Sequence, residues 1–435
     1  MVKILKIGLI VLFLGTLATH IWSQQRFYVK GQAPGDSIRI DRVVVVGNLR
    51  TKKPIILREL EFRPGEAVTW KNLELAQKRI ENLYLFNRVQ FRVLKFDTEN
   101  VLKINVTERW TLFPIPILNF NEHSFSKISY GGGVADYNFR GRAEKIILIG
   151  WAGFNPGFEF SYQNGWFGGP KRYFASLSAH SVQVANHTTA FKDLESRING
   201  LSIGFGRRFG IYKFINFGTN IEQVKPSNPM AALRSTGRDF LWGGGVSLKY
   251  DNRDLHEYPT FGHLAELGVH KAWLNSWGKG YTSYLYDFRF YHSFRSAIFA
   301  VRTFGEFLDG DIPVYKRLFL GYGERIRGHF SETFEGEKRL LNSMEMRFPI
   351  IPKRYYSLSQ KIPALKDLEF AVYGTLFGDT GTVWTQPRRL ALKHFQSGFG
   401  MGINMLLPYS NIVRFEFAWN ENLEGEFIFD SNVAF

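Results

Sequence analysis

The segment Tyr284-Leu-Tyr-Asp-Phe-Arg-Phe290 carries an aromatic ring at every second residue. Asp287 and Arg289 place full charges between the rings. Because successive side chains of a β-strand point to opposite faces, this segment has one aromatic, charge-free face and one charged face. This combination is typical of a strand with lipid on one side and water on the other.

The same alternation recurs in about sixteen segments of about ten residues, and an even number of strands is usual in single-chain bacterial barrels. The sequence therefore predicts an antiparallel transmembrane β-barrel over residues 110–435. The segments begin near Thr111, Ser129, Glu144, Gly157, Lys171, Arg197, Lys213, Arg238, Gly262, Gly280, Ala297, Leu340, Asp367, Phe395, Asn411 and Gly425.

The composition excludes several other classes of protein. Aromatic residues make up 16% of the 435 residues, which excludes a disordered chain, and there is no Cys for a disulfide scaffold or a thiolate metal site. The formal net charge is +16, but the basic residues are spread over aromatic-rich strands and form no basic segment. We therefore expect no nucleic-acid partner.

The N-terminus indicates export. Lys3 and Lys6 precede the apolar run Ile7–Ala18, and a polar stretch follows as far as Ser23. This order predicts a secretory signal peptide over residues 1–23, with a single N-terminal anchor helix as the alternative. Beyond it, no apolar stretch is long enough for a membrane helix.

Residues 37–108 form a different unit, which predicts a small α/β domain. Periodicity and turn residues give the order strand, helix, helix, strand, strand. Thr51 and Thr69 are the expected N-caps of the two helices. The expected elements are a strand over 38–46, helices over 51–60 and 70–84, and strands over 89–94 and 101–106.

No catalytic residue, metal ligand set or cofactor site is predicted. Gly200-Leu-Ser-Ile-Gly204 matches the Gly-x-Ser-x-Gly pattern of serine hydrolases. That pattern requires a strained turn and a following helix, whereas Ser202 lies within an expected strand. We therefore expect the protein not to be an enzyme.

The longest expected loop, Leu308–Arg339, contains the stretch Leu318-Phe-Leu-Gly-Tyr-Gly-Glu-Arg-Ile-Arg-Gly-His329. A long loop with apolar residues is expected to fold back on the protein. A buried Arg327 then needs a carboxylate, because an unpaired buried charge costs several kcal/mol. Asp379, on the charged face of a later strand, is the expected partner, and Glu345 is the second candidate.

Three stretches carry a resemblance to a known family. Ile326-Arg-Gly-His329 is similar to the Val/Ile-Arg-Gly-Phe/Tyr signature of the BamA/TamA outer-membrane assembly and translocation family, although His329 replaces the aromatic residue. Phe377-Gly-Asp-Thr-Gly381 resembles the Phe-x-Asp-x-Gly strand of that family. Ile38–Thr107 resembles one POTRA domain, where relatives usually carry several.

The resemblance implies a protein of the bacterial outer membrane with its POTRA domain in the periplasm. It implies a non-enzymatic factor that inserts or translocates polypeptides and binds client strands at the POTRA sheet edge. Outer-membrane lipids, and periplasmic chaperones or accessory proteins, are the further implied partners. A two-partner-type exporter and a passive channel or structural barrel remain alternatives, and the sequence does not name the client.

Two further sets of residues are expected to act near the end of the chain. Gly398, Gly400 and Gly402 share one strand face and would give plasticity to a seam between the first and last strands. Phe427, Phe429 and Phe435 are expected on one face of a final strand, where they resemble the aromatic signal that outer-membrane assembly machinery reads.

Overall fold

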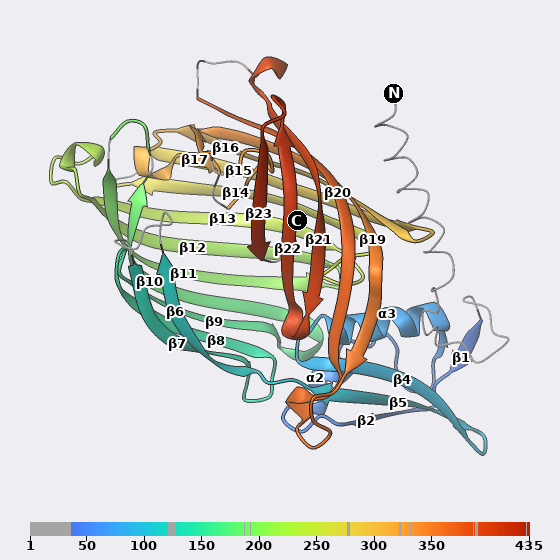
Figure 1. Cartoon of the computed structure of the whole chain (residues 1–435). Coiled ribbons are helices and arrows are strands. Elements are labelled where there is room, and N and C mark those ends of the chain that lie inside the picture. Colours follow the sequence, from blue (N-terminus) through green and yellow to red (C-terminus); the bar gives the residue numbers. More distant parts are fainter. Residues whose placement is uncertain are drawn as a thin grey trace, which may run out of the picture.

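The structure is a computed structural model that describes residues 36–435 except 121–127, 187, 192, 276–278, 322, 331, 386, 388–389 and 432. The predicted signal peptide lies outside the described residues. A small α/β domain lies across one end of a large curved sheet (Figure 1). None of the helices in the described ranges has the length and apolarity to cross a membrane.

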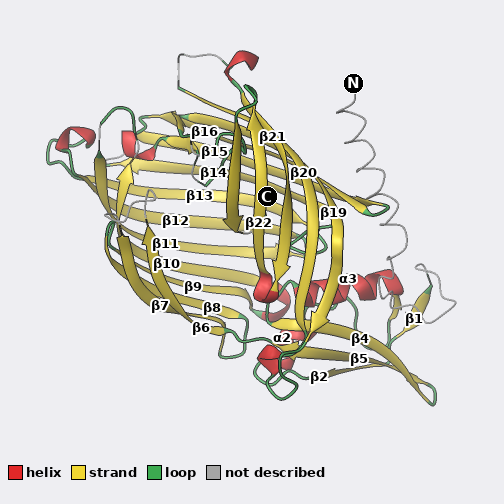
Figure 2. Ribbon diagram, viewed as in Figure 1, coloured by secondary structure: helices red, strands yellow, loops and turns green. Residues whose placement is uncertain are grey.

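The large sheet has sixteen strands, and neighbours in the sheet are antiparallel. The sheet curls into a barrel, so that β19–β22 face the strands in the middle of the sheet (Figures 1 and 2). The strands are β6 (Leu112–Phe120), β7 (Ile128–Phe139), β8 (Glu144–Gly153), β9 (Gly157–Phe167), β10 (Tyr173–Asn186), β11 (Leu194–Phe209), β12 (Lys213–Pro226), β13 (Asp239–Asp251), β14 (Gly262–Leu274), β15 (Gly280–Phe294), β16 (Ala297–Gly310), β19 (Lys338–Tyr356), β20 (Leu368–Trp384), β21 (Gln396–Leu407), β22 (Asn411–Asn420) and β23 (Gly425–Ser431).

The predicted barrel is confirmed strand by strand, and each expected start lies within three residues of the observed one. The two faces also differ as predicted. Tyr284 and Phe290 are each 47% exposed on the outside, whereas Asp287 is 7% exposed on the inside. Asp287 is neutralised there by Arg289 at 2.6 Å and Arg302 at 2.9 Å.

The long loop between β16 and β19 folds inward, as predicted. Within it β17 (Leu318–Leu320) pairs with β18 (Phe334–Gly336). Leu320 and Ile326 are each 1% exposed and pack against Phe304 and Leu341 of the barrel wall. The loop therefore has an apolar anchor inside the barrel.

The small domain has the predicted element order, with one strand divided in two. Residues 38–46 form β1 (Ser37–Arg39) and β2 (Arg42–Val46) instead of one strand. Ile40 turns into the core with no exposed surface, and the Asp41 carboxylate accepts a hydrogen bond from the Asn100 amide. β1 pairs with β3 (Ala67–Thr69), and the main sheet has the order β2-β5-β4, with β4 (Phe86–Phe96) and β5 (Glu99–Glu108) antiparallel.

One of the two predicted helix caps is confirmed. The Thr69 side chain accepts a hydrogen bond from the Asn72 amide at the start of α3 (Trp70–Glu81), whose buried face includes Leu73 and Ile80. α3 ends three residues before the predicted end, because Tyr84 adopts a left-handed backbone with φ 57°.

The predicted Thr51 cap is wrong. Helix α2 (Lys53–Leu57) begins after Lys52 and has no side-chain cap. The Thr51 amide instead donates to Glu108 at 2.7 Å, and its hydroxyl accepts from Asn138 of the β7 strand at 3.0 Å. Thr51 therefore joins the small domain to the barrel.

The small domain is held by turns at one end of the barrel. Each contact joins a polar side chain of the domain to a turn or strand end. The contacts are Arg50 with Asp136 at 2.6 Å, Arg58 with the Trp166 carbonyl at 3.2 Å, Asn87 with the Lys366 carbonyl at 2.9 Å, Arg88 over the Tyr355 ring at 4.6 Å, and Arg109 with Ser410 at 3.0 Å.

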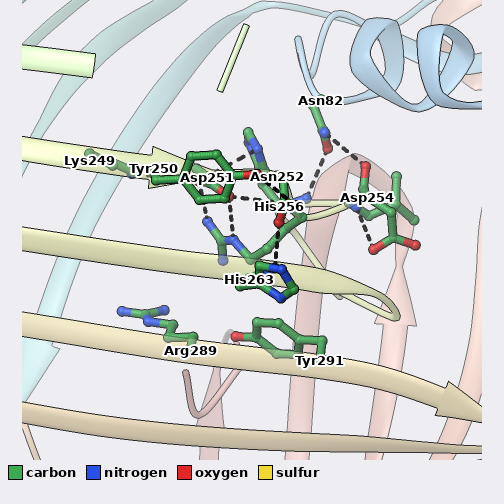
Figure 3. A network of polar contacts seen from close by, with 12 residues as sticks. Asn82, Lys249, Tyr250, Asp251, Asn252, Asp254, His256, His263, Arg289 and Tyr291 are labelled. Atoms are coloured by element: carbon green, nitrogen blue, oxygen red, sulfur yellow. Dashed lines mark hydrogen bonds and ion pairs between the residues drawn. The ribbon is translucent and has the colours of Figure 1, made fainter. Parts of the chain in front are cut away.

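The turn between β13 and β14 makes a further contact, with helix α3 (Figure 3). Asn82 donates to the Asp254 carbonyl at 3.0 Å and accepts from the His256 amide at 2.9 Å. Lys78 lies 3.3 Å from the Asp254 carboxylate. That carboxylate also accepts from the Thr260 and Phe261 amides, so it orders the turn as well.

We predict that Asn82→Ala loosens this junction. The variant loses two hydrogen bonds, each with a net contribution of about 0.5–1.5 kcal/mol, or about 1–3 kcal/mol together. Trypsin should then cut after Arg109, in the connection between the domains, faster than in the wild type. Asn72→Ala, at an exposed position in the first turn of α3, is the matched control. Equal cleavage of both variants would contradict the role of Asn82.

Candidate functional site

Arg327, in the inward-folded loop, contacts three carboxylates. Its Nε and Nη2 donate to both oxygens of Asp379 on β20, at 2.7 and 2.8 Å. Its Nη1 donates to Glu345 on β19 at 2.6 Å and to Glu416 on β22 at 3.1 Å. The structure thus brings Arg327 to both carboxylates that the sequence predicts, and to a third.

Two more arginines continue this network, because each approaches a carboxylate that Arg327 already uses. Arg347 lies 2.7 Å from the second oxygen of Glu345. Arg414 donates to the second oxygen of Glu416 at 2.8 Å, and to Asp430 at 2.7 Å. Alternating charges therefore connect the loop with β19, β20, β22 and β23.

The Arg327 guanidinium is shielded from water and supported by an aromatic ring. Arg327 is 4% exposed, and its Cζ lies 3.8 Å from the centroid of the Phe377 ring. Burial alone would lower the pKa of Arg327, but the carboxylates of Asp379 and Glu345 hold it well above its ordinary value. The positive charge of the loop is therefore permanent.

The glycines of β21 allow the loop backbone to approach the barrel wall. A Cβ atom at Gly398 would overlap the carbonyl oxygen of Arg327. Gly328 has φ 104°, and its own Cβ would lie 2.8 Å from the Trp419 carbonyl oxygen. At Gly400 a Cβ would lie 2.6 Å from the Phe377 ring. The Arg-Gly pair therefore needs small residues on both sides of the contact.

Two other predicted site glycines also make close contacts. At Gly381 a Cβ would lie 3.1 Å from Ile326 Cδ1, and at Gly402 it would lie 2.6 Å from Glu416 Cγ. Gly398, Gly400 and Gly402 lie on β21, two strands from the outer strand β23. Their role in seam plasticity stays a prediction.

His329 joins the loop to the β22–β23 turn. Its Nδ1 lies 3.0 Å from Glu332, and its Nε2 lies 2.8 Å from Glu421. Both ring nitrogens face a carboxylate, and only the protonated ring donates from both. Burial alone would lower the pKa of His329, but the hydrogen bonds to Glu421 and Glu332 raise it above its ordinary value.

The predicted final aromatic face is wrong in one position. Phe427 and Phe429 are 66% and 64% exposed on β23, as predicted, but Phe435 is 3% exposed. β23 ends at Ser431, and Phe435 lies inside the barrel, where its main-chain oxygen accepts a hydrogen bond from the Tyr291 hydroxyl at 3.1 Å. Phe435 leaves the strand because the interior offers this hydrogen bond and aromatic contacts.

Several members of the network are absent from the sequence-based site. Alternation in the sequence places Glu416 and Arg414 on the charged face of their strand, so their inward direction could be predicted. Their partners could not be predicted in this way. Arg347 is fully buried, and Glu426 accepts from the Gly328 amide at 2.8 Å. Alternation shows which face of a strand a side chain lies on. Predicting which side chains of different strands form ion pairs requires the register between those strands.

The sheet has two outer strands, β6 and β23. No pairing joins them in the residues that the structure describes. A cavity of about 510 Å³ lies near this seam, and its lining includes Phe113, Ile115 and Lys145 from the first strands and Ile412 and Val433 from the end of the chain.

These features define a β-barrel protein with one small α/β domain and an inward-folded arginine loop. The chain belongs to the Omp85 superfamily, whose domain matches residues 138–431. The POTRA family, described as a surface antigen variable number repeat, matches residues 38–109. The protein is therefore an outer-membrane β-barrel with its POTRA domain in the periplasm.

Two curated relatives are outer membrane protein assembly factors named BamA. The chain is 22% identical over 314 residues to BamA of Nitratidesulfovibrio vulgaris, which covers 68% of this chain and 38% of that protein. It is 22% identical over 247 residues to BamA of Neorickettsia risticii, covering 53% and 31%. The matches span less than two fifths of these relatives.

Solved structures share the fold. Haemophilus ducreyi BamA lacking POTRA domains 1–3 has a TM-score of 0.53 at 16% identity, covering 91% of this chain and 84% of that chain. CdiB from Escherichia coli has a TM-score of 0.54 at 11% identity, covering 92% and 75%.

We predict that Arg327→Ala releases the loop. The change leaves three carboxylates without their shared cation, and breaking a buried ion pair costs about 3–5 kcal/mol. Proteinase K should cut the loop near Gly321–His329 faster in the folded variant than in the wild type. Asp379→Ala should act in the same direction but less, because Glu345 and Glu416 still hold Arg327.

The exposed Arg234 supplies the control for this experiment. Arg234→Ala should leave the loop resistant. A loop that stays resistant in Arg327→Ala would show that the charge network does not hold it.

We predict that the loop loosens as pH rises, because of His329. Its pKa is raised in the folded protein, so the stabilisation is fully present below about pH 6.5 and is lost as pH rises through the raised pKa. The rate of loop cleavage by proteinase K in the wild type, divided by the rate in His329→Phe at the same pH, should rise with pH. A ratio of the two rates that does not change with pH would contradict the prediction.

Proposed function

We propose that this protein inserts polypeptides into the bacterial outer membrane and acts without catalytic chemistry. The observation that carries the proposal is the arginine loop, which is held by carboxylates of β19, β20 and β22 beside the end of the sheet. An ion-pair network fixes this part of the wall, while the outer strands β6 and β23 are each paired along one edge only in the described residues. An incoming strand can pair with such an edge.

The POTRA sheet offers a second place for client strands. β5 is central in the order β2-β5-β4, so β2 and β4 are outer strands. We propose that one of them binds client segments through backbone hydrogen bonds, which suits clients of varied sequence. The exposed aromatic and aliphatic side chains of the barrel face outer-membrane lipids. Periplasmic chaperones or accessory proteins are proposed as further partners.

Export of one secreted partner is the second candidate function. Its support is the structural similarity to CdiB from Acinetobacter baumannii, with a TM-score of 0.51 at 11% identity and coverage of 91% of this chain and 74% of that chain. Both candidates use the same barrel, so a cellular readout must separate them.

The proposal that the protein is not an enzyme rests on Ser202. Ser202 lies inside β11, opposite Ser178 of β10 and Asn220 of β12 in the ladder. A nucleophile of the Gly-x-Ser-x-Gly type needs a strand-to-helix turn, and Ser202 continues a regular strand.

Depletion of the protein from its native cell tests the proposal. We expect heat-modifiable barrel proteins to disappear from the outer membrane, as measured by quantitative mass spectrometry of that membrane. Wild-type protein and Ser202→Ala should restore them, whereas Arg327→Ala should not. Loss of one secreted protein with an unchanged outer membrane would favour the exporter. Unchanged membrane and secreted proteins would contradict both functions and favour a passive or structural barrel.

A further inference from the structure

Residues 433–435 occupy a defined place inside the barrel. Ala434 packs against Tyr291 and Ala300, which are buried together with Phe435. Val433 packs against a second buried cluster that contains Tyr258. These three residues therefore make specific interior contacts, in addition to the hydrogen bond from the Tyr291 hydroxyl to the main-chain oxygen of Phe435.

Arg347 lies among the rings of this place. Its Cζ is 4.7 Å from the Tyr258 ring, 5.7 Å from the Phe435 ring and 5.8 Å from the Tyr291 ring. Arg347 has no exposed surface, and its Nη1 has no hydrogen-bond partner in the described structure. Aromatic faces therefore stabilise the side of the guanidinium that Glu345 does not reach. Withdrawal of Phe435 would remove one of the three rings.

Glu345 connects this place with the loop. One of its carboxylate oxygens lies 2.6 Å from Arg327 Nη1, and the other lies 2.7 Å from Arg347 Nη2. If Arg347 shifts after the loss of a ring, the Glu345 carboxylate moves with it. The contact between Glu345 and Arg327 then changes. The same argument runs in the other direction, because coupling between two sites is reciprocal.

We propose that Tyr258, Tyr291 and Arg347 form a receptor site for residues 433–435, and that Glu345 couples occupancy of this site to docking of the arginine loop. When the tail occupies the site, the loop is held. When the tail withdraws toward the seam, the grip on the loop weakens. The two segments beside the outer strand β23 thus move together.

The cysteine-free chain allows a direct test. Ala434→Cys gives a single thiol that is partly buried in the docked tail and reacts faster with a maleimide when the tail leaves the interior. Proteinase K cleavage near Gly321–His329 reports release of the loop. Both rates are measured on the full chain folded in lipid vesicles, with heat-modifiable migration as the criterion of folding.

The tail is perturbed in two ways, each with a control. Phe435→Ala removes the aromatic ring of the tail. Tyr291→Phe removes only the hydroxyl that binds the tail, and this smaller change serves if Phe435→Ala does not fold. Phe429→Ala removes an exposed ring from β23 and should change neither rate. We expect both tail variants to raise maleimide labelling and loop cleavage, the latter by about fivefold or more for Phe435→Ala.

Two further variants test the connection. Arg327→Ala perturbs the loop instead of the tail, and it should raise maleimide labelling in the Ala434→Cys background. In a Glu345→Gln background, Phe435→Ala should add no further loop cleavage. The proposal is overturned if Ala434→Cys alone labels as fast as the same protein unfolded, since the tail then does not occupy the site. It is also overturned if tail variants raise labelling while loop cleavage equals that of Phe429→Ala.

Discussion

A permanent positive charge inside a barrel must be neutralised where it lies, and Arg327 imposes this requirement on the rest of the structure. Removing a guanidinium from water is repaid only when several acceptors surround it with good geometry. Asp379, Glu345 and Glu416 come from three different strands, so the charge can be satisfied only when these strands stand in their native register. The ion pairs thereby select one arrangement of the sheet, because a one-residue slip would turn each carboxylate outward.

The glycines have the complementary role of permitting contact. Arg327 reaches its partners only because the loop backbone lies directly against β21, where Gly398 has no side chain. Charge supplies the attraction and small residues supply the space. The strands that carry these charges on their inner face carry exposed aromatic or aliphatic side chains on their outer face.

Most of the fold was predictable because it depends on local alternation. Strand starts agree within three residues, and Arg327 with Asp379 followed from charge and strand order. Thr51 was misassigned because a local cap pattern was overridden by Glu108 and Asn138, which are distant in sequence.

Phe435 shows the same limit at the other end of the chain. Alternation continued past Ser431 places it on the lipid side with Phe427, whereas Tyr291 and Arg347 draw it inward. No local pattern encodes contacts with strands so far away in the sequence. Local patterns therefore specify faces, and tertiary partners decide caps, tails and multi-strand ion pairs.

The length of β19 has a mechanical consequence. The strand has 19 residues and is about 60 Å long, whereas about 9–11 residues suffice to cross the membrane. Its far end, at Tyr355, lies under Arg88 of the POTRA domain, and its middle carries Glu345. One continuous strand thus joins the contact with the POTRA domain at Tyr355 to the carboxylate that holds the arginine loop, so the two places share a covalent backbone across the membrane.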